Sequence, residues 1–304
     1  MCSVFVIIVT YNGLRWYDRC LGSLIESEML VQIVVIDNAS KDETVAYIKE
    51  QFPEIHLIES QENLGFAKAN NIGMRYALDH GADYVFLLNQ DAWINEKNTI
   101  SELVRISKEN PQYYILAPLQ QYAVSGRIER ETLYHFYDDA ISGNDYLSDV
   151  YLHQVKDDYE SSYACAACWL LPIETVKRIG GFDPLLHHYG EDDNYIQRVK
   201  YHGGQLAICP KVSMSHDIEN RSKEYRDSYL DWKKYMLINL ANINYNFDVK
   251  SILRSRLNTI IIQFLRLNKK LLKKSMPEYK FIKQMADKIE QSRQQNKKLG
   301  PNWL

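Results

Sequence analysis

Short runs of β-branched and other apolar residues alternate with longer amphipathic stretches along the first third of the chain. The apolar runs predict strands at about 4–9, 32–37, 55–59 and 84–88. The stretches between them predict helices at about 14–26, 42–51 and 66–80. This alternation is typical of βα units, so we expect an α/β fold with a mostly parallel sheet flanked by helices.

Two residue patterns mark the ends of these helices. Ser40 and Glu43 have the spacing of a capping box at the start of the second helix. Gly81 can adopt the left-handed conformation that ends the third.

The later elements are less regular. We expect helices near 99–109, 173–179 and 192–202, and strands near 114–117, 163–171, 206–209 and 212–216. Residues 118–160 are polar and rich in tyrosine without a firm period, which indicates a variable recognition region.

Helical periodicity dominates after about residue 222. The pattern therefore divides the chain into a domain at 1–221 and a helical, basic extension at 222–304. Within the domain, a first half at about 1–117 is followed by a second half at about 118–221.

The composition fits a large folded core, with 304 residues of which 46% are hydrophobic and 25% charged. No apolar run approaches the roughly 20 residues that cross a bilayer. The run at 4–9 lacks the basic leader of a secretory signal. Five scattered cysteines argue against a disulfide framework, so we expect a cytoplasmic protein with reduced thiols.

Polar residues follow three of the predicted strands where each strand ends. They are Thr10-Tyr11-Asn12, Asp37-Asn38-Ala39-Ser40 and Asn89-Gln90-Asp91. A glycine-containing turn at 63–71 leads into the third helix. Because the ligand crevice of an open parallel sheet lies beyond the carboxyl ends of its strands, these residues predict a polar cleft.

In their order, the motifs of this chain resemble glycosyltransferase family 2, the inverting group with the GT-A fold, and within it the rhamnosyltransferase-like branch. The matching segments are TYN at 10–12, VVIDNASKDET at 34–44, NLGFAKANN at 63–71, LLNQDA at 87–92, GGFDP at 180–184, GEDDNYIQRVKYHG at 190–203 and the isolated His216. The resemblance spans roughly residues 3–220 and implies a nucleotide-sugar donor. The first half would then hold the nucleotide-sugar and the second half the acceptor.

The resemblance assigns the nucleotide base to Asp37, whose carboxylate would accept the imide N–H of uracil or thymine. The same carboxylate could instead cap the following helix. Lys68 could approach the diphosphate or lie on a solvated helix face. The other residues expected around the donor are Thr10, Tyr11, Asn12, Asn63, Gly65, Asn71, Asn89, Gln90 and Asp91.

A departing diphosphate must be neutralised by a divalent cation or by basic side chains. Asp91 offers the oxygen ligand that Mn²⁺ or Mg²⁺ prefers, and the resemblance implies His216 as a second ligand. A lone histidine is otherwise most often an ordinary, satisfied polar residue. The family's Asp-x-Asp motif begins here with Asn89, which should weaken metal binding, although the rhamnosyltransferase-like branch also tolerates Asn there.

Inversion requires a base that takes the proton of the acceptor hydroxyl as its oxygen attacks. Glu191, Asp192 and Asp193 open a predicted helix, whose dipole favours ionised carboxylates. The resemblance assigns the base to Asp192, with Glu191 orienting the acceptor or the base. An acidic first turn without a catalytic role is the alternative. Arg198, on the same helix, is expected to pair with a carboxylate or approach the diphosphate.

Trp169 lies near the position where the family lines the sugar and acceptor subsites, but a tryptophan in a strand can equally pack in the core. Cys165 and Cys168 have the spacing of half a zinc site. No second pair completes that site, so we expect both cysteines to pack.

The net charge of −3 conceals a strong asymmetry. Residues 249–304 contain 14 Lys and Arg against 3 Asp and Glu, a local charge of +11 that leaves −14 for the first 248 residues. Apolar residues recur among the cations of 250–274, as in helices that bind the anionic inner surface of a membrane. Packing on the preceding domain, or on a second subunit in a homodimer, explains the pattern equally well. No nucleic-acid recognition motif accompanies the charge.

We therefore expect an inverting transferase that uses Mn²⁺ or Mg²⁺ and a UDP- or dTDP-linked hexose or deoxyhexose. Its acceptor would be a hydroxyl of a growing surface glycan, free or lipid-linked, such as a capsule or O-antigen. The alternative, suggested by Asn89, is a catalytically weak glycan-binding or assembly-scaffold protein with the same fold. A nicotinamide-dependent oxidoreductase is excluded because no Gly-x-Gly-x-x-Gly follows the first strand.

Overall fold

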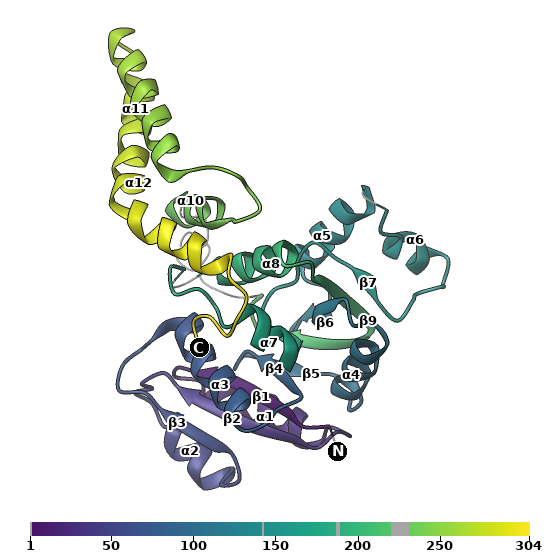
Figure 1. The fold of residues 1–304 in the computed structure, drawn as a ribbon. Coiled ribbons are helices and arrows are strands. Elements are labelled where there is room, and N and C mark those ends of the chain that lie inside the picture. The colour runs from purple at the N-terminus through teal and green to yellow at the C-terminus, as the bar shows by residue number, and fades with distance from the viewer. Residues whose placement is uncertain (1, 142, 187–188, 220–231) are drawn as a thin grey trace.

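One nine-stranded sheet runs through the first two thirds of the chain in the computed structural model (Figure 1). The structure describes residues 2–141, 143–186, 189–219 and 232–304, so the expected boundary at 221–222 lies outside the described residues. The strands are β1 (Val4–Thr10), β2 (Val31–Asp37), β3 (His56–Glu59), β4 (Tyr84–Leu88), β5 (Ala92–Ile94), β6 (Tyr113–Tyr122), β7 (Tyr159–Glu160), β8 (Cys168–Pro172) and β9 (Gln205–His216).

The strand order is β3-β2-β1-β4-β8-β6-β9-β5, with β7 pairing β9 at the side. The first four strands are mutually parallel, whereas β8 runs antiparallel to both β4 and β6. The predicted first four strands are confirmed to within two residues at each end. They were readable because strands buried on both faces carry continuous apolar runs.

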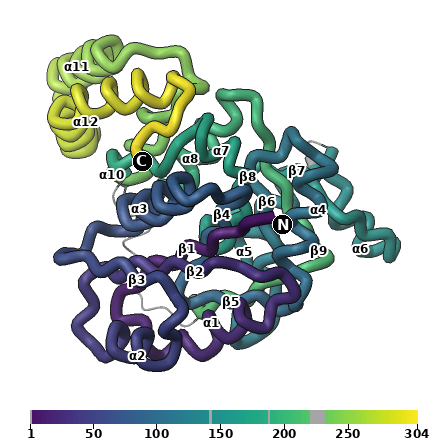
Figure 2. Tube along the Cα trace, turned by 60° about the horizontal axis from the view of Figure 1, so that its bottom comes forward, coloured from purple at the N-terminus to yellow at the C-terminus, as the bar shows by residue number. Residues whose placement is uncertain are grey.

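Helices cover both faces of the sheet (Figure 2). The 3₁₀ turn η1 (Leu14–Trp16) leads into α1 (Tyr17–Ile25), which packs with α2 (Thr44–Gln51) and α4 (Thr99–Glu109) into one buried apolar cluster. The opposite cluster contains α3 (Gly65–Asp79), α7 (Ile173–Ile179) and α8 (Glu191–Tyr201). The expected α/β architecture is thereby confirmed.

Several local expectations need correction. The capping box expected at Ser40 and Glu43 does not form, because the Ser40 hydroxyl accepts a 2.9 Å hydrogen bond from the backbone N–H of Asn12 and Glu43 makes no capping bond. Asp42 Oδ1 accepts the N–H of Thr44 at the start of α2 instead, at 3.1 Å. The two short strands expected at 206–209 and 212–216 form the single strand β9, which absorbs a register shift opposite β6. The strand expected at 163–171 begins only at Cys168. Gly81, in contrast, has the expected left-handed φ of 74°.

Residues 118–160 contain more structure than the sequence predicted. Strand β6 continues to Tyr122, and the helices α5 (Arg130–Ile141) and α6 (Tyr146–Tyr151) follow. Neither helix had a clear period, because apolar and tyrosine side chains also occupy their exposed positions. The exposed ones are Leu133, Tyr134, Tyr137, Leu147, Val150 and Tyr151. This region forms one wall of the cavity described below.

The extension is helical, as predicted, with α10 (Trp232–Ala241), α11 (Val249–Leu265) and α12 (Lys269–Asn296). The long helices α11 and α12 form a hairpin that projects from the rest of the molecule (Figure 1). The end of α12 returns to the α/β domain, where Ser292 and Asn296 donate hydrogen bonds of 2.5 and 2.7 Å to the buried carboxylate of Asp183. No described helix is long and apolar enough to span a membrane.

Candidate active site

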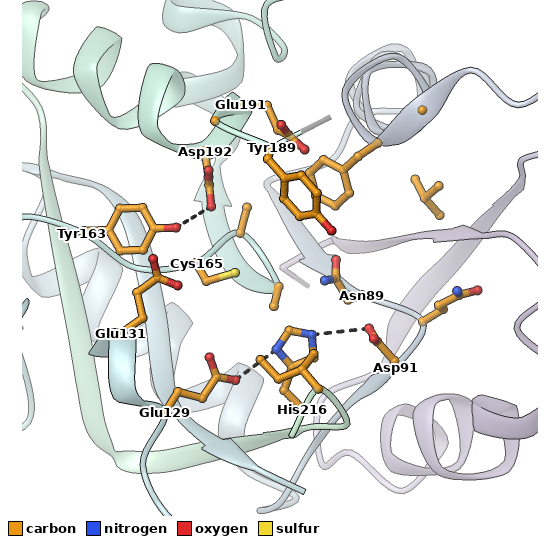
Figure 3. A pocket seen from close by; sticks show the side chains of 18 of the residues that line it. Asn89, Asp91, Glu129, Glu131, Tyr163, Cys165, Tyr189, Glu191, Asp192 and His216 are labelled. Atoms are coloured by element: carbon orange, nitrogen blue, oxygen red, sulfur yellow. Dashed lines mark hydrogen bonds and ion pairs between the residues drawn. The ribbon is translucent and has the colours of Figure 1, made fainter. Parts of the chain in front are cut away.

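A cavity of about 1170 Å³ opens beyond the carboxyl ends of β1 and β4. Asn89 and Asp91 line it from the loop after β4, and Asp192 lines it from the first turn of α8. Figure 3 shows these side chains facing one another across the hollow. The two carboxylates on which the sequence argument depends therefore share one cavity.

Strand pairing brings Asp91 and His216 together. Ala92 in β5 pairs with His216 at the end of β9, and the backbone N–H of Asp217 donates a 2.9 Å hydrogen bond to the carbonyl of Asp91. His216 Nε2 consequently lies 3.4 Å from Asp91 Oδ1, as an ion pair. The three-residue strand β5 was too short to predict from the residue pattern, so only the family resemblance, which implied both residues as ligands of one metal, pointed to this contact.

Glu129 holds the opposite side of the His216 ring. Its Oε1 lies 3.0 Å from Nδ1, and both side chains are buried (Figure 3). Burial alone would lower the pKa of His216, but the two flanking carboxylates of Asp91 and Glu129 outweigh it and raise the pKa to about 9. The protonated imidazole offsets one of the two negative charges, and a metal ion at Nε2 would take the place of that proton.

The donor set around His216 fits a divalent cation held partly by the substrate. A metal-binding histidine usually offers one ring nitrogen to the metal and the other to a carboxylate, as His216 offers Nδ1 to Glu129. Its buried Nε2 makes no hydrogen bond within the described chain and faces Asp91. Among the described residues no cluster of three or more His, Cys, Asp or Glu could hold a metal. Two protein ligands suit Mg²⁺ or Mn²⁺ when phosphate oxygens supply the others.

Asp192 is held from the second half of the domain. The phenol of Tyr163 donates a 2.7 Å hydrogen bond to Asp192 Oδ2, and the backbone N–H of Asp193 donates to Oδ1 at 2.9 Å. Burial raises the pKa of Asp192, while these hydrogen bonds oppose the rise. The higher pKa makes the carboxylate a stronger proton acceptor, as a general base requires.

The two neighbouring acids are also perturbed. Burial, followed by the charge of Asp192, raises the pKa of Glu191 to about 8 and that of Asp193 to about 8. Glu191 lines the cavity, but Asp193 is absent from its wall. Glu191 is therefore placed to touch a ligand in the cavity, and Asp193 is not.

A tight turn sets the start of α8. Tyr189 and Gly190 both have positive φ, 67° and 91°. A Cβ on Gly190 would lie 2.5 Å from Ile238 of α10, so this position requires glycine for its backbone and for its space. The extension thus packs directly on the turn before Glu191. The preceding residues 187–188 lie outside the described residues.

Gln90 ties the ends of β1 and β4 together. Its Oε1 accepts hydrogen bonds from Thr10 Oγ1 at 2.8 Å and from the backbone N–H of Tyr11 at 3.0 Å. The turn after β3 is fixed likewise, because Asn63 Oδ1 accepts from the N–H of Gly65 and from the Asn38 amide. The expected donor residues that line the cavity are Tyr11, Asn63, Gly65, Asn89, Gln90 and Asp91.

Five expected donor residues do not line the cavity: Thr10, Asn12, Asp37, Lys68 and Asn71. Thr10 is buried beneath Gln90, and Lys68 is exposed on α3. The Asn12 side chain accepts the N–H of Lys41 at 2.8 Å. The buried carboxylate of Asp37 accepts the N–H of Ser40 at 3.0 Å, a backbone-stabilising role of the kind that the sequence had left open. Its contact with a base remains a prediction.

Three expected contacts must be corrected. Trp169 is 0% exposed and packs against Phe182 and Tyr195, so its ring cannot stack on a sugar. Arg198 is 1% exposed, and its guanidinium donates to the carbonyls of Ile179 and Gly181 instead of meeting a carboxylate or a diphosphate. Asn71, expected at the donor, is buried instead. Its side-chain amide donates a hydrogen bond to the carbonyl of Phe182 and accepts one from the N–H of Phe182.

The cavity also contains residues that the sequence did not single out. Glu129, Glu131, Tyr134 and His135 come from the start of α5 and the segment before it, and Tyr163 precedes β8. The only signal for the first four was the tyrosine-rich composition of 118–160, and Tyr163 had none. The Cys165–Cys168 pair is a pair of free thiols, as expected, with Cys165 on the cavity wall.

Comparisons with known proteins place these features in one family. The model of the family "Glycosyl transferase family 2" matches residues 5–180. The dTDP-rhamnosyl transferase RfbF of Shigella flexneri is 25% identical over 221 residues, which are 72% of this chain and 71% of that protein. The low-salt glycan biosynthesis hexosyltransferase Agl10 of Haloferax volcanii is 25% identical over 247 residues, or 76% and 74% of the two chains.

A solved structure shares the fold. GalNAc-T7 with UDP, GalNAc and Mn²⁺ superposes with a TM-score of 0.59 at 19% identity, over 78% of this chain and 47% of that one. The family match covers more than half of this chain, and the fold and motif order agree with it. The chain therefore belongs to glycosyl transferase family 2.

Proposed function

We propose that this glycosyltransferase moves a hexose or deoxyhexose from a UDP- or dTDP-linked donor to a hydroxyl of a growing surface glycan, with inversion. The observation that carries the proposal is that Asp91 and Asp192 line one cavity at the tips of the parallel strands. Because the Shigella flexneri relative is named a dTDP-rhamnosyl transferase, a dTDP-linked deoxyhexose is the first donor to test.

In the proposed reaction Asp192 accepts the proton of the acceptor hydroxyl. The acceptor oxygen uses an electron pair to form a bond to the anomeric carbon. The bond from that carbon to the diphosphate oxygen breaks, and the diphosphate leaves with its electron pair. Tyr163 holds the Asp192 carboxylate in position, and Glu191 lies beside it on the same helix turn. Attack opposite the diphosphate gives inversion.

Asp91 and His216 would hold Mn²⁺ or Mg²⁺ at the diphosphate, with Glu129 orienting the imidazole. The bound cation would neutralise the charge that develops on the leaving group. Asn89 contributes an amide where a second carboxylate would add charge. GalNAc-T7, which shares the fold, was solved with Mn²⁺, which makes Mn²⁺ the first ion to test.

The test is release of nucleoside diphosphate from a panel of UDP-, dTDP- and GDP-sugars with a glycan acceptor. Asp192→Asn should lower turnover by about 10²–10⁴-fold, the usual contribution of a general base. Asp193→Asn is the matched control, because it removes the adjacent carboxylate outside the cavity, and it should keep most of its turnover. A folded Asp192→Asn protein with wild-type turnover would refute the assignment of the base.

A second candidate, a glycan-binding or assembly-scaffold protein, is favoured only by Asn89. It predicts no nucleoside diphosphate release with any donor while glycan binding persists. A thermal-shift screen of dTDP, UDP and GDP, with and without Mn²⁺, separates the readings further, because a donor site is stabilised by its nucleotide. Stronger stabilisation by GDP than by UDP and dTDP would exclude the proposed use of Asp37.

A further inference from the structure

The outer half of the α11–α12 hairpin exposes large apolar side chains. Phe264 is 65% exposed, Leu265 74% and Leu267 78%. The inner half differs, because Val249 and Ile289 lie in a buried cluster shared by α10, α11 and α12. Packing within the protein therefore explains the inner apolar residues but not the outer ones.

The exposed residues are ordered along the helix. Leu257, Ile261, Phe264 and Leu265 follow one another at helical spacing and fall on one face of α11. Leu267, with a φ of 51°, continues this surface into the turn between the two helices. Residues 257–274 are called the hairpin tip below.

Positive charge surrounds this surface. Residues 249–277 contain eight Lys and Arg and no Asp or Glu. Arg256 pairs with Glu278 at 3.1 Å, near the inner end of the tip. The exposed cations around the apolar face are Arg254, Arg266, Lys269, Lys270, Lys273 and Lys274.

We propose that the hairpin tip binds an anionic phospholipid surface. Its apolar side chains would enter the interfacial layer, and its cations would meet the lipid phosphates. The hairpin extends away from the sheet, so its tip can reach a flat surface ahead of the domain (Figure 1). A second copy is a poorer occupant, because two tips without any acidic residue would repel each other. Contact stays interfacial, since no described helix can cross a bilayer.

Co-sedimentation of the full chain with lipid vesicles tests the proposal without a donor or an acceptor. Vesicles of phosphatidylcholine with about 30% phosphatidylglycerol should bind the protein, and vesicles of phosphatidylcholine alone should bind it about tenfold less. Raising NaCl from about 0.1 M to about 0.5 M should release it, because screening weakens attraction between exposed charges. Leu265→Ser/Leu267→Ser should reduce binding about tenfold or more.

The matched control is Ile25→Ser/Leu30→Ser, which removes two exposed apolar residues (55% and 85% exposed) from the far domain. It should bind like the wild type, and circular dichroism confirms that both variants are folded. Equal binding by all three proteins, or equal binding to neutral and anionic vesicles, would overturn the proposal. So would a dimer that Leu265→Ser/Leu267→Ser dissociates, seen by sedimentation velocity, in a protein that binds no vesicles.

Discussion

The phenol of Tyr163 donates a 2.7 Å hydrogen bond to Oδ2 of Asp192, the proposed base. The two residues come from the segment before β8 and from the first turn of α8, on the second half of the domain. Burial, and then the charge of Asp192, hold the pKa of Tyr163 well above its usual range, so the phenol keeps its proton and acts as the donor. The bond favours the ionised carboxylate and thereby opposes the rise in the pKa of Asp192.

Tyr163→Phe should raise the pKa of Asp192 by about one to two pH units, because a hydrogen bond to a charged group contributes about 1.5–3 kcal/mol. The acid limb of the kcat/KM profile should then move to higher pH, since the base stays protonated over a wider range. Tyr134→Phe, in the same cavity, serves as the control and should leave the limb in place. If the acid limb of Tyr163→Phe is unchanged or moves to lower pH, the hydrogen bond from Tyr163 does not lower the pKa of Asp192.

Glu129→Ala should weaken Mn²⁺ binding about tenfold or more, because the partner that orients a metal-binding imidazole is lost. Glu129→Gln keeps an oxygen that accepts from His216 Nδ1, so it should restore most of the affinity. Calorimetric Mn²⁺ titration in the presence of the nucleoside diphosphate measures both. Equal affinities in all three proteins would show that Glu129 has only a structural role.

Asn89→Asp should tighten Mn²⁺ binding about tenfold or more, because a second carboxylate near Asp91 adds favourable Coulomb energy. Asn63→Asp is the matched control, since it adds the same charge to the same cavity from the turn after β3. The same calorimetric titration applies. The metal assignment fails if both variants, or neither, change the affinity.

Asp193→Asn should stabilise the protein above neutral pH. The folded chain raises the pKa of Asp193 from 3.8 to about 8, so the folded state binds a proton that the unfolded state has lost. Wild-type stability therefore falls as the pH rises from about 4 to about 8, and the neutral amide removes this loss. In thermal denaturation the Tm of the variant should exceed that of the wild type by about 2–4 °C for each kcal/mol of added unfolding free energy. This difference should grow from pH 5 to pH 8. A constant difference across this range would exclude titration as the cause.

The first half of the domain was predictable from local sequence. The strands up to β4 are buried on both faces and stand out as apolar runs, and the polar residues after them mark the cleft. Asn89, Gln90 and Asp91 lie on its wall as the position after a strand implies. Strand β5 and helices α5 and α6 lacked this contrast, because their length or composition gives no clear period.

Burial of single side chains was less predictable. Trp169 and Arg198 are residue types that bind sugars and phosphates well, but both are enclosed by the core. Asp192 and Arg198 lie on different sides of α8. Asp192 therefore faces the cavity, while Arg198 donates hydrogen bonds to backbone carbonyls in the core. Knowing a residue's type and the helix or strand that carries it does not show whether its side chain faces a ligand or the core.

The sequence by itself determined the family, the sheet of the first half, the acidic turn at Glu191 and the cationic character of the extension, because each depends on residues close together in the chain. Tertiary structure alone decided that Glu129, His216 and Asp91 form one row, that Tyr163 holds Asp192, and that the hairpin tip is left uncovered. These relations join residues far apart in sequence, and they arise only when β5, β6 and β9 pair and the helices pack against the sheet.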